Sequence, residues 1–217
     1  MMADKPLQAV ELSALRQHEL EPLVHAIEDL ELSRFQYISV HAPSSLDPDF
    51  EERALELLGI VFQRGWPIIV HPDAIHCAER WLRFEGLLFI ENMEKRKPIG
   101  QTAADLTIIF NQLPDAMLCL DLGHVRQVDP TMSEAAAILT RFGNKLKQLH
   151  VSEVNTQSRH DALTLESIMA FQRVASFMPA DVPIILESRV PEAQIETEVK
   201  NALAALDPAN TLAVAGD

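Results

Sequence analysis

The stretch Ala116–His124, AMLCLDLGH, ends an apolar run with an aspartate and places a histidine three residues later. A carboxylate and an imidazole are both good ligands for divalent metal ions. Six other short apolar runs also end in a carboxylate or an imidazole. The seven terminal residues are Glu11, His41, His71, Glu91, Asp121, His150 and Glu187. Clustered groups of these types are usually compensated by divalent cations, so the sequence predicts a metal site.

Seven units of strand followed by helix carry these residues. The apolar runs are rich in β-branched residues and lack polar alternation, which is typical of buried parallel strands. We expect strands at residues 7–13, 35–41, 66–71, 86–91, 116–121, 146–152 and 182–188. Segments with helical periodicity lie around residues 17–30, 49–64, 73–83, 102–112, 131–144, 163–177 and 191–206, and Thr131 with Glu134 matches a capping box. This pattern predicts a (β/α) barrel or an open doubly wound sheet.

The polar strand ends favour the barrel. In a barrel all carboxyl ends of the strands converge on one face, whereas an open sheet spreads them along a line. We therefore expect an α/β fold, a TIM-type barrel built as a single domain over residues 1–217. A lone histidine or glutamate at a strand end is most often a hydrogen-bonded rim residue, so the metal prediction depends on the repetition. His18, His25 and His76 lack this placement and are expected to be surface residues.

Composition and net charge limit the cellular location and the classes of binding partner that we expect. No apolar run approaches the roughly 18 residues that cross a membrane, and the N-terminus carries no secretory signal, so we expect a cytoplasmic protein. The formal net charge of −14 opposes binding to extended nucleic acid. Cys77 and Cys119 form no recognisable zinc or disulfide framework.

The ordered set SVHAP, IVHPD, FIENM, LDLGH, LHVSE, SRH and ILES resembles the xylose isomerase-like TIM-barrel superfamily, which includes sugar phosphate isomerases and epimerases. The likeness is strongest to its endonuclease IV branch, AP endonuclease family 2. It implies two or three divalent metal ions, zinc or manganese. Three sets of ligands would hold them, and the first two sets share one residue. The first set is His41, His71 and Glu91; the second is Asp121, His150, Glu187 and the same bridging Glu91; the third contains His124 and His160.

Two features depart from the family pattern. Ser158 stands where the family has an aspartate, and Glu153 or Asp161 are the candidates to replace that ligand. The segment LQAVELS aligns with the second strand of these barrels, so we expect seven strands with the family's first strand missing. Such a barrel either closes with seven strands or leaves a gap. We expect a gap, covered by the N-terminal segment, the C-terminal tail DPANTLAVAGD, or a second chain in a homo-oligomer.

Three functions remain open for this arrangement. One is a metal-dependent isomerase or epimerase acting on a small sugar or sugar phosphate, with Glu91 and Glu187 as the catalytic residues that move a proton. Another is a multinuclear phosphoesterase similar to endonuclease IV. A third is a degenerate barrel that binds metal without turnover. Eight candidate ligands exceed the needs of one ion and the acidic composition opposes DNA, so we favour an enzyme acting on a sugar or sugar phosphate.

Basic residues follow several of the candidate ligands along the chain. These are Lys95, Arg96, Arg126, Arg159 and Arg189. Lysine and arginine side chains near metal ions commonly bind phosphate groups, so these five are candidate phosphate-binding residues. The alternative for each of them is an exposed side chain in a surface salt bridge.

Overall fold

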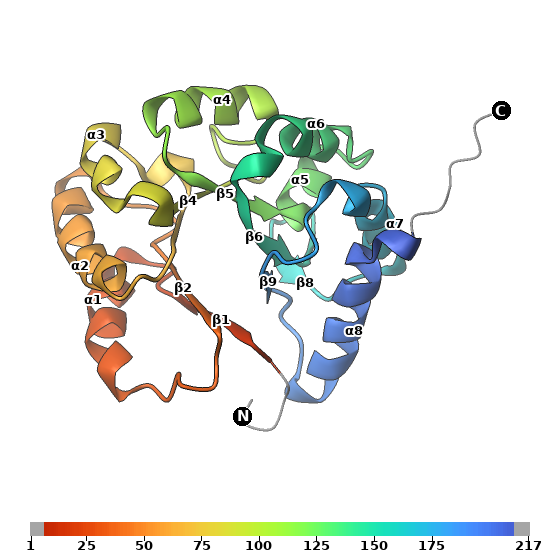
Figure 1. Ribbon diagram of the computed structural model, residues 1–217, viewed down its shortest axis with the longest axis horizontal. Helices are drawn as coiled ribbons and strands as arrows, with labels where there is room; N and C mark the ends of the chain where they lie inside the picture. Colours follow the sequence, from red (N-terminus) through yellow and green to blue (C-terminus); the bar gives the residue numbers. More distant parts are fainter. Residues whose placement is uncertain (1–6, 211–217) are drawn as a thin grey trace.

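Seven parallel strands form one sheet, and their order in the sheet follows their order in the chain (Figure 1). The structure is a computed structural model that describes residues 7–210. The strands are β1 (Ala9–Ser13), β2 (Tyr37–His41), β3 (Ile68–Val70), β4 (Leu88–Glu91), β5 (Met117–Asp121), β6 (Leu146–Val151) and β9 (Ile184–Leu186). All seven coincide with the segments expected from the sequence. The predicted seven-stranded TIM-type α/β fold is therefore confirmed.

Eight α-helices of the described residues surround the strands (Figure 1). They are α1 (Gln17–Ala26), α2 (Glu51–Gln63), α3 (Ala78–Trp81), α4 (Ala103–Gln112), α5 (Leu122–Val128), α6 (Ser133–Phe142), α7 (Leu165–Gln172) and α8 (Ile195–Leu206). Their apolar faces and the outward side chains of the strands make the main core. No helix among residues 7–210 is long and apolar enough to span a bilayer.

The inner strands β2 to β6 are largely buried on both faces, which explains why their sequences show no polar alternation, whereas β1 at the open edge is half-buried. Ile69, Phe89 and Cys119 form a small cluster separate from the main core, so alternate positions of β3, β4 and β5 point into the barrel. Two residues beyond each of these positions stand His71, Glu91 and Asp121. The period of two along a strand therefore directs the polar strand ends into the same interior, one layer above the apolar cluster.

The barrel is open along one side. Strands β1 and β9 are the two ends of the sheet, and no backbone pairing joins them among the described residues. A groove of about 270 Å³ lies between them, lined by β1, β9 and α8, with Val10, Ile185 and Val199 among its residues. The predicted gap is confirmed. Of the N-terminal segment and the tail 207–217, expected to cover it, residues 1–6 and 211–217 lie outside the described residues, whereas Asp207 and Pro208 line a different hollow. The second chain stays a prediction.

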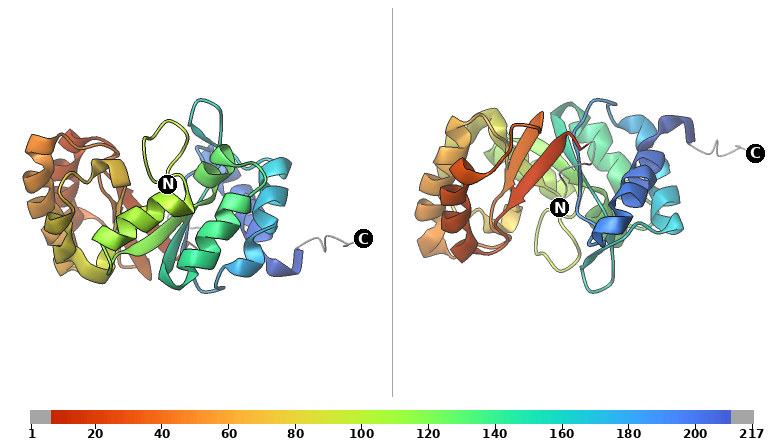
Figure 2. Two further views of the ribbon diagram at one scale, coloured as in Figure 1. Left: turned by 90° about the horizontal axis from the view of Figure 1, so that it is seen from above. Right: turned by 90° about the horizontal axis from the view of Figure 1, so that it is seen from below.

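Several local features differ from the expectations. Helix α5 follows β5 directly, and a short hairpin of β7 (Glu153–Val154) and β8 (His160–Asp161) follows β6; neither was predicted. The capping box expected at Thr131 is absent, because α6 begins at Ser133 and the backbone N–H of Glu134 donates to Asp129. Figure 2 shows the loop after β4 and the hairpin loop projecting side by side from one face of the barrel.

Candidate metal centre

The polar strand ends meet at the face of the barrel where the strands end. His41, Glu91 and Asp121 are the last residues of β2, β4 and β5, while His71 and Glu187 directly follow β3 and β9. His150 is the penultimate residue of β6, and Glu11 lies two residues before the end of β1, which continues to Ser13. In the register of β1 with β2, Ser13 pairs with His41 and Glu11 pairs with Ser39, so Glu11 lies one inward layer below the other polar ends.

His41, His71 and Glu91 form the first of three groups whose potential ligand atoms all lie within 4.8 Å of one another. Oε2 of Glu91 lies 3.0 Å from Nε2 of His41 and 3.3 Å from Nε2 of His71. The Nδ1 atoms of the two rings lie 2.6 Å from the carbonyl of Ala42 and 3.2 Å from that of Ser44. Hydrogen bonds of this kind leave the Nε2 lone pairs for a cation.

Glu91, Asp121, His150 and Glu187 form the second group. Nδ1 of His150 lies 3.4 Å from carboxylate oxygens of both Glu91 and Glu187. Within the part of the chain that the structure describes, the buried atoms Asp121 Oδ2 and His150 Nδ1 have no hydrogen-bond partner. Buried polar atoms without partners are costly, and a divalent cation would satisfy both. The donor set therefore fits a metal ion.

Asp121, His124 and His160 form the third group. Asp121 supplies its carboxylate, and the expectation that Glu153 or Asp161 does so is wrong. Glu153 is paired with Arg126, and Asp161 accepts a hydrogen bond of 2.6 Å from the amide of Asn155.

Ser158, which stands where the sequence resemblance implies an aspartate, has a different partner. Its hydroxyl donates to Oε2 of Glu94 at 2.7 Å, which links the hairpin loop to the loop after β4. His160 is oriented by a separate contact, 2.8 Å between its Nδ1 and the hydroxyl of Ser152. The hairpin thus carries a candidate ligand of the third group, His160, without contributing a carboxylate to that group.

The buried carboxylates and imidazoles of this centre shift one another's pKa values. Burial alone would raise the pKa of Glu91, but the imidazoles of His150 and His71 hold it well below its ordinary value. Burial would lower the pKa of His41, yet its contact with Glu91 raises that pKa to about 9. Burial raises the pKa of Glu187 to about 8. Protons therefore occupy part of this centre near neutral pH, and a metal ion bound there would displace them.

Two buried amides that support the ligands were missed in the sequence. Asn92 donates to the backbone carbonyl of Asp121 at 2.9 Å and accepts from its backbone N–H at 2.7 Å. The amide nitrogen of Gln148 lies 2.7 Å from Nε2 of His150. Gln148 stands two residues before His150 on an otherwise apolar inward face, and that period of two is the signal that identifies it. Asn92 only directly follows Glu91, which is a weaker signal.

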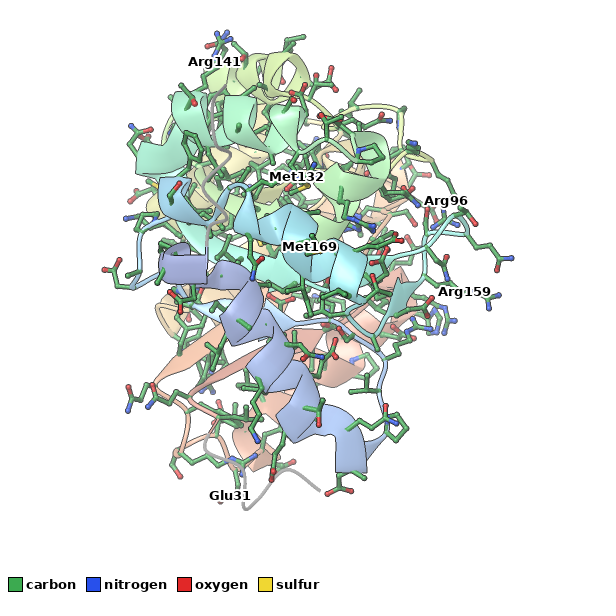
Figure 3. The ribbon with its side chains drawn as sticks, turned by 90° about the vertical axis from the view of Figure 1, so that its right-hand side faces the viewer. Glu31, Arg96, Met132, Arg141, Arg159 and Met169 are labelled. Atoms are coloured by element: carbon green, nitrogen blue, oxygen red, sulfur yellow. The ribbon has the colours of Figure 1, made fainter. Side chains whose placement is uncertain are left out.

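A cleft of about 390 Å³ opens above the centre, and the basic residues are distributed around it unequally. Arg96 and Arg189 line this cleft, and Arg96 is paired with Glu94 at 3.0 Å. Lys95 and Arg126 line an adjacent hollow, where Arg126 is paired with Glu153. Arg159 is exposed and lies on the same side of the molecule as Arg96 (Figure 3). Phosphate binding by these five residues stays a prediction. Arg96 and Arg189 are the best placed of the five for it, because they line the cleft.

The chain is similar in fold to several solved structures. No protein-family model and no curated protein sequence matches the chain. Among solved structures, endonuclease IV from Thermus thermophilus is similar at 16% identity and a TM-score of 0.63, over 92% of this chain and 89% of the other. A xylose isomerase-like TIM-barrel protein from Mycobacterium smegmatis, in complex with magnesium, matches at 12% identity and a TM-score of 0.57, over 92% and 85%.

A 3-keto-D-glucoside 4-epimerase from E. coli is also similar, at 11% identity and a TM-score of 0.50, over 91% of this chain and 98% of the other. Together these likenesses show that the chain has the xylose isomerase-like TIM-barrel fold. At such identities they establish the fold and leave the reaction to be argued from the site.

Proposed function

We propose that this single-domain chain is a divalent-metal-dependent enzyme acting on a small sugar or sugar phosphate, as an isomerase or epimerase. The observation that carries the proposal is the second group, in which buried atoms of Asp121 and His150 find no hydrogen-bond partner among residues 7–210 and lie beside two glutamates. The cleft of about 390 Å³ above it is in the range of small-molecule sites. The similarity in fold to a 3-keto-D-glucoside 4-epimerase supports the same substrate class.

Different residues of the chain would hold the metal ion and transfer the proton in such a reaction. Asp121 and His150, both fully buried, would hold the ion and exclude water from beneath it. When bound, the ion polarises the oxygen atoms of a sugar and so acidifies the adjacent carbon–hydrogen bond. Glu91 and Glu187 approach His150 from β4 and from the end of β9, and their carboxylates would take the proton from that carbon and return it.

The number of ligands supports two ions that share Glu91, because His41 and His71 complete a set of their own; both oxygens of Glu91 would then be engaged, and Glu187 would move the proton. Imidazole and carboxylate ligands suit zinc or manganese, and these are the ions we propose. Occupation of the third group, Asp121, His124 and His160, would bring the number to three. At the mouth of the cleft, Arg96 and Arg189 would bind the phosphate of a sugar phosphate.

A multinuclear phosphoesterase is the second candidate. It is favoured by the presence of all three ligand groups in one cleft and by the similarity in fold to endonuclease IV. The net charge of −14 opposes a duplex substrate, so a small phosphoester fits this candidate better than DNA. A barrel that binds metal without turnover is the third possibility.

One pair of assays separates the candidates. The purified protein, loaded with zinc or manganese, is incubated in deuterated water with a panel of ketoses and ketose phosphates, and deuterium at the carbon next to the carbonyl is followed by NMR. We expect incorporation that Glu187→Gln abolishes. Phosphate release from small phosphoesters, or cleavage of abasic-site DNA, without any incorporation would overturn the proposal in favour of the phosphoesterase. Metal binding with neither activity would favour the non-catalytic barrel.

A further inference from the structure

Glu11 is a buried carboxylate that the proposed reaction does not use. Only 3% of its side chain is exposed, although it comes from β1 at the open edge of the barrel. Its oxygens Oε1 and Oε2 both lie 3.3 Å from Nε2 of His150, a ligand of the second group. Glu11 therefore faces the side of that imidazole that points away from Glu91 and Glu187.

The carboxylate of Glu11 is held in place from two further sides. The hydroxyl of Ser39 donates to its Oε2 at 2.9 Å, and the amide of Gln148 donates to the same atom at 2.7 Å. Gln148 is itself fixed, because the hydroxyl of Tyr37 donates to its Oε1 at 2.6 Å. Strands β1, β2 and β6 thus build a polar layer directly beneath the ligands.

Nε2 of His150 contacts two side chains that favour opposite protonation states of this nitrogen. Glu11 can only accept a hydrogen bond, so it favours the tautomer with a proton on Nε2. The amide nitrogen of Gln148, 2.7 Å away, can only donate, so it favours the tautomer with a proton on Nδ1. The first tautomer leaves the Nδ1 lone pair facing Glu91 and Glu187, whereas the second places a proton where a metal ion would bind.

We propose that Glu11 is a positioning residue that keeps the proton of His150 on Nε2 and so presents the Nδ1 lone pair to a divalent cation. The inference rests on the proposed metal site. A carboxylate decides between the two partners because a charge-assisted hydrogen bond is about twice as strong as one between neutral groups. A carboxylate behind a ligating imidazole also raises its basicity and fixes the plane of its ring.

The position of Glu11 gives the edge strand a role in the centre. Glu11 lines both the cleft above the ligands and the groove between β1 and β9. Strand β1 supplies no member of the three ligand groups, yet through Glu11 it orients a ligand on β6, across the interior of the barrel.

The test replaces the charge of Glu11 and keeps its shape. Zinc dissociation constants are measured for the full chain and for Glu11→Gln by competition with a chromophoric chelator at fixed pH. We expect affinity to fall about 10- to 100-fold, the range typical of lost carboxylate support behind a ligating histidine. In the zinc-bound state, NMR of ¹⁵N-histidine-labelled protein should show a slowly exchanging Nε2–H of His150 that shifts and exchanges faster in Glu11→Gln.

A matched control and a conservative variant make the result specific. Glu51→Gln changes another buried glutamate, one whose oxygen accepts from His76, Cys77 and Trp81, and it should leave zinc affinity and the His150 signals unchanged. Glu11→Asp keeps the charge and should retain most of the affinity. Unchanged zinc affinity and unchanged His150 signals in Glu11→Gln would overturn the inference, as would an equal loss in Glu11→Asp. A wild-type chain that binds no zinc or manganese would refute the proposed metal site itself.

Discussion

Nε2 of His41 lies 3.0 Å from Oε2 of Glu91, and only 4% and 1% of the two side chains are exposed. The same Glu91 offers Oε1 to His150 at 3.4 Å. The two oxygens of one carboxylate thus face the first and the second ligand group. This division is the geometric basis for a bridging role of Glu91.

Replacement of that bridge should empty both groups. We expect Glu91→Gln to lose the ions of the first and second groups, because an amide is a poor substitute for a shared carboxylate. His160→Ala is the control and should affect only the third group. Elemental analysis of ions per chain at fixed pH measures both variants. An unaltered count in Glu91→Gln would rule out the bridging scheme.

The first group distinguishes two ions from one. If His41 and His71 hold an ion with Glu91, His41→Ala and His71→Ala should each lower the metal content by about one ion per chain. If a single ion is held by the second group alone, both variants should keep the wild-type content. The same elemental analysis decides, with circular dichroism as a check that each variant is folded.

The raised pKa of His41 predicts opposite pH dependences for metal-free stability and for metal binding. Its pKa rises from 6.5 to about 9 in the folded chain, so protonation stabilises the metal-free fold fully below pH 6.5. That contribution is lost as the pH rises through 9. Zinc competes with the same proton, so zinc affinity should increase with pH up to about 9. Denaturant unfolding of metal-free protein and zinc titrations from pH 6 to 10 test the two signs. A zinc affinity that is flat over this range would contradict the assignment of His41.

Glu51 predicts a stability effect away from the metal centre. Burial would raise its pKa, but hydrogen bonds from the indole of Trp81 and the backbone N–H groups of Cys77 and His76 bring it below the ordinary value of 4.5. The stability it contributes is therefore present above pH 4.5 and is lost as the pH falls below that value. We expect Glu51→Gln to cost about 1–3 kcal/mol at pH 7 and less at pH 4, measured by urea unfolding. A loss of equal size at both pH values would contradict this explanation.

Gly123 predicts a packing effect that reaches a ligand. A Cβ atom at this position would lie 2.6 Å from the carbonyl oxygen of Ser152 and 2.6 Å from Cγ2 of Val154. Gly123→Ala should destabilise the fold by about 1–3 kcal/mol and displace the neighbouring His124. Gly59→Ala, in α2 with nothing within 4 Å of the new atom, is the control and should stabilise by about 0.5–1 kcal/mol. Thermal unfolding compares the two; equal effects would show that the contact at Gly123 is relieved at no cost.

The sequence predicted the strands well because they depend on short-range patterns. Each strand is an apolar run with a polar residue at or near its end, and this pattern is readable without a partner strand. The third group was predicted incompletely because its carboxylate, Asp121, already belonged to the second group in the sequence interpretation. Whether one side chain serves two groups depends on distances across the barrel, and spacing along the chain does not determine these.

The layer beneath the ligands was predicted less well. Glu11 was expected at the end of its strand, but β1 continues for two more residues, and only the pairing with β2 places Glu11 at the depth of Ser39. The hairpin β7–β8 was missed because its two strands are only two residues long, too short to show any periodicity. Helix α5 was missed because it begins directly after Asp121, with no linker to mark the change.

The sequential order of the strands also has a consequence for how the chain folds. Every hydrogen-bonded strand pair joins a strand to the next strand of the sheet along the chain, and the described residues contain no pairing between β1 and β9. Each strand can therefore add to the preceding one during synthesis, without the loop-closure entropy of a joint between the first and last strands. A side-chain contact connects distant parts of the chain instead, between Glu11 on β1 and His150 on β6, two strands that are not paired in the sheet. We expect the ligand cluster to be assembled last, so that capture of a metal ion coincides with the final step of folding.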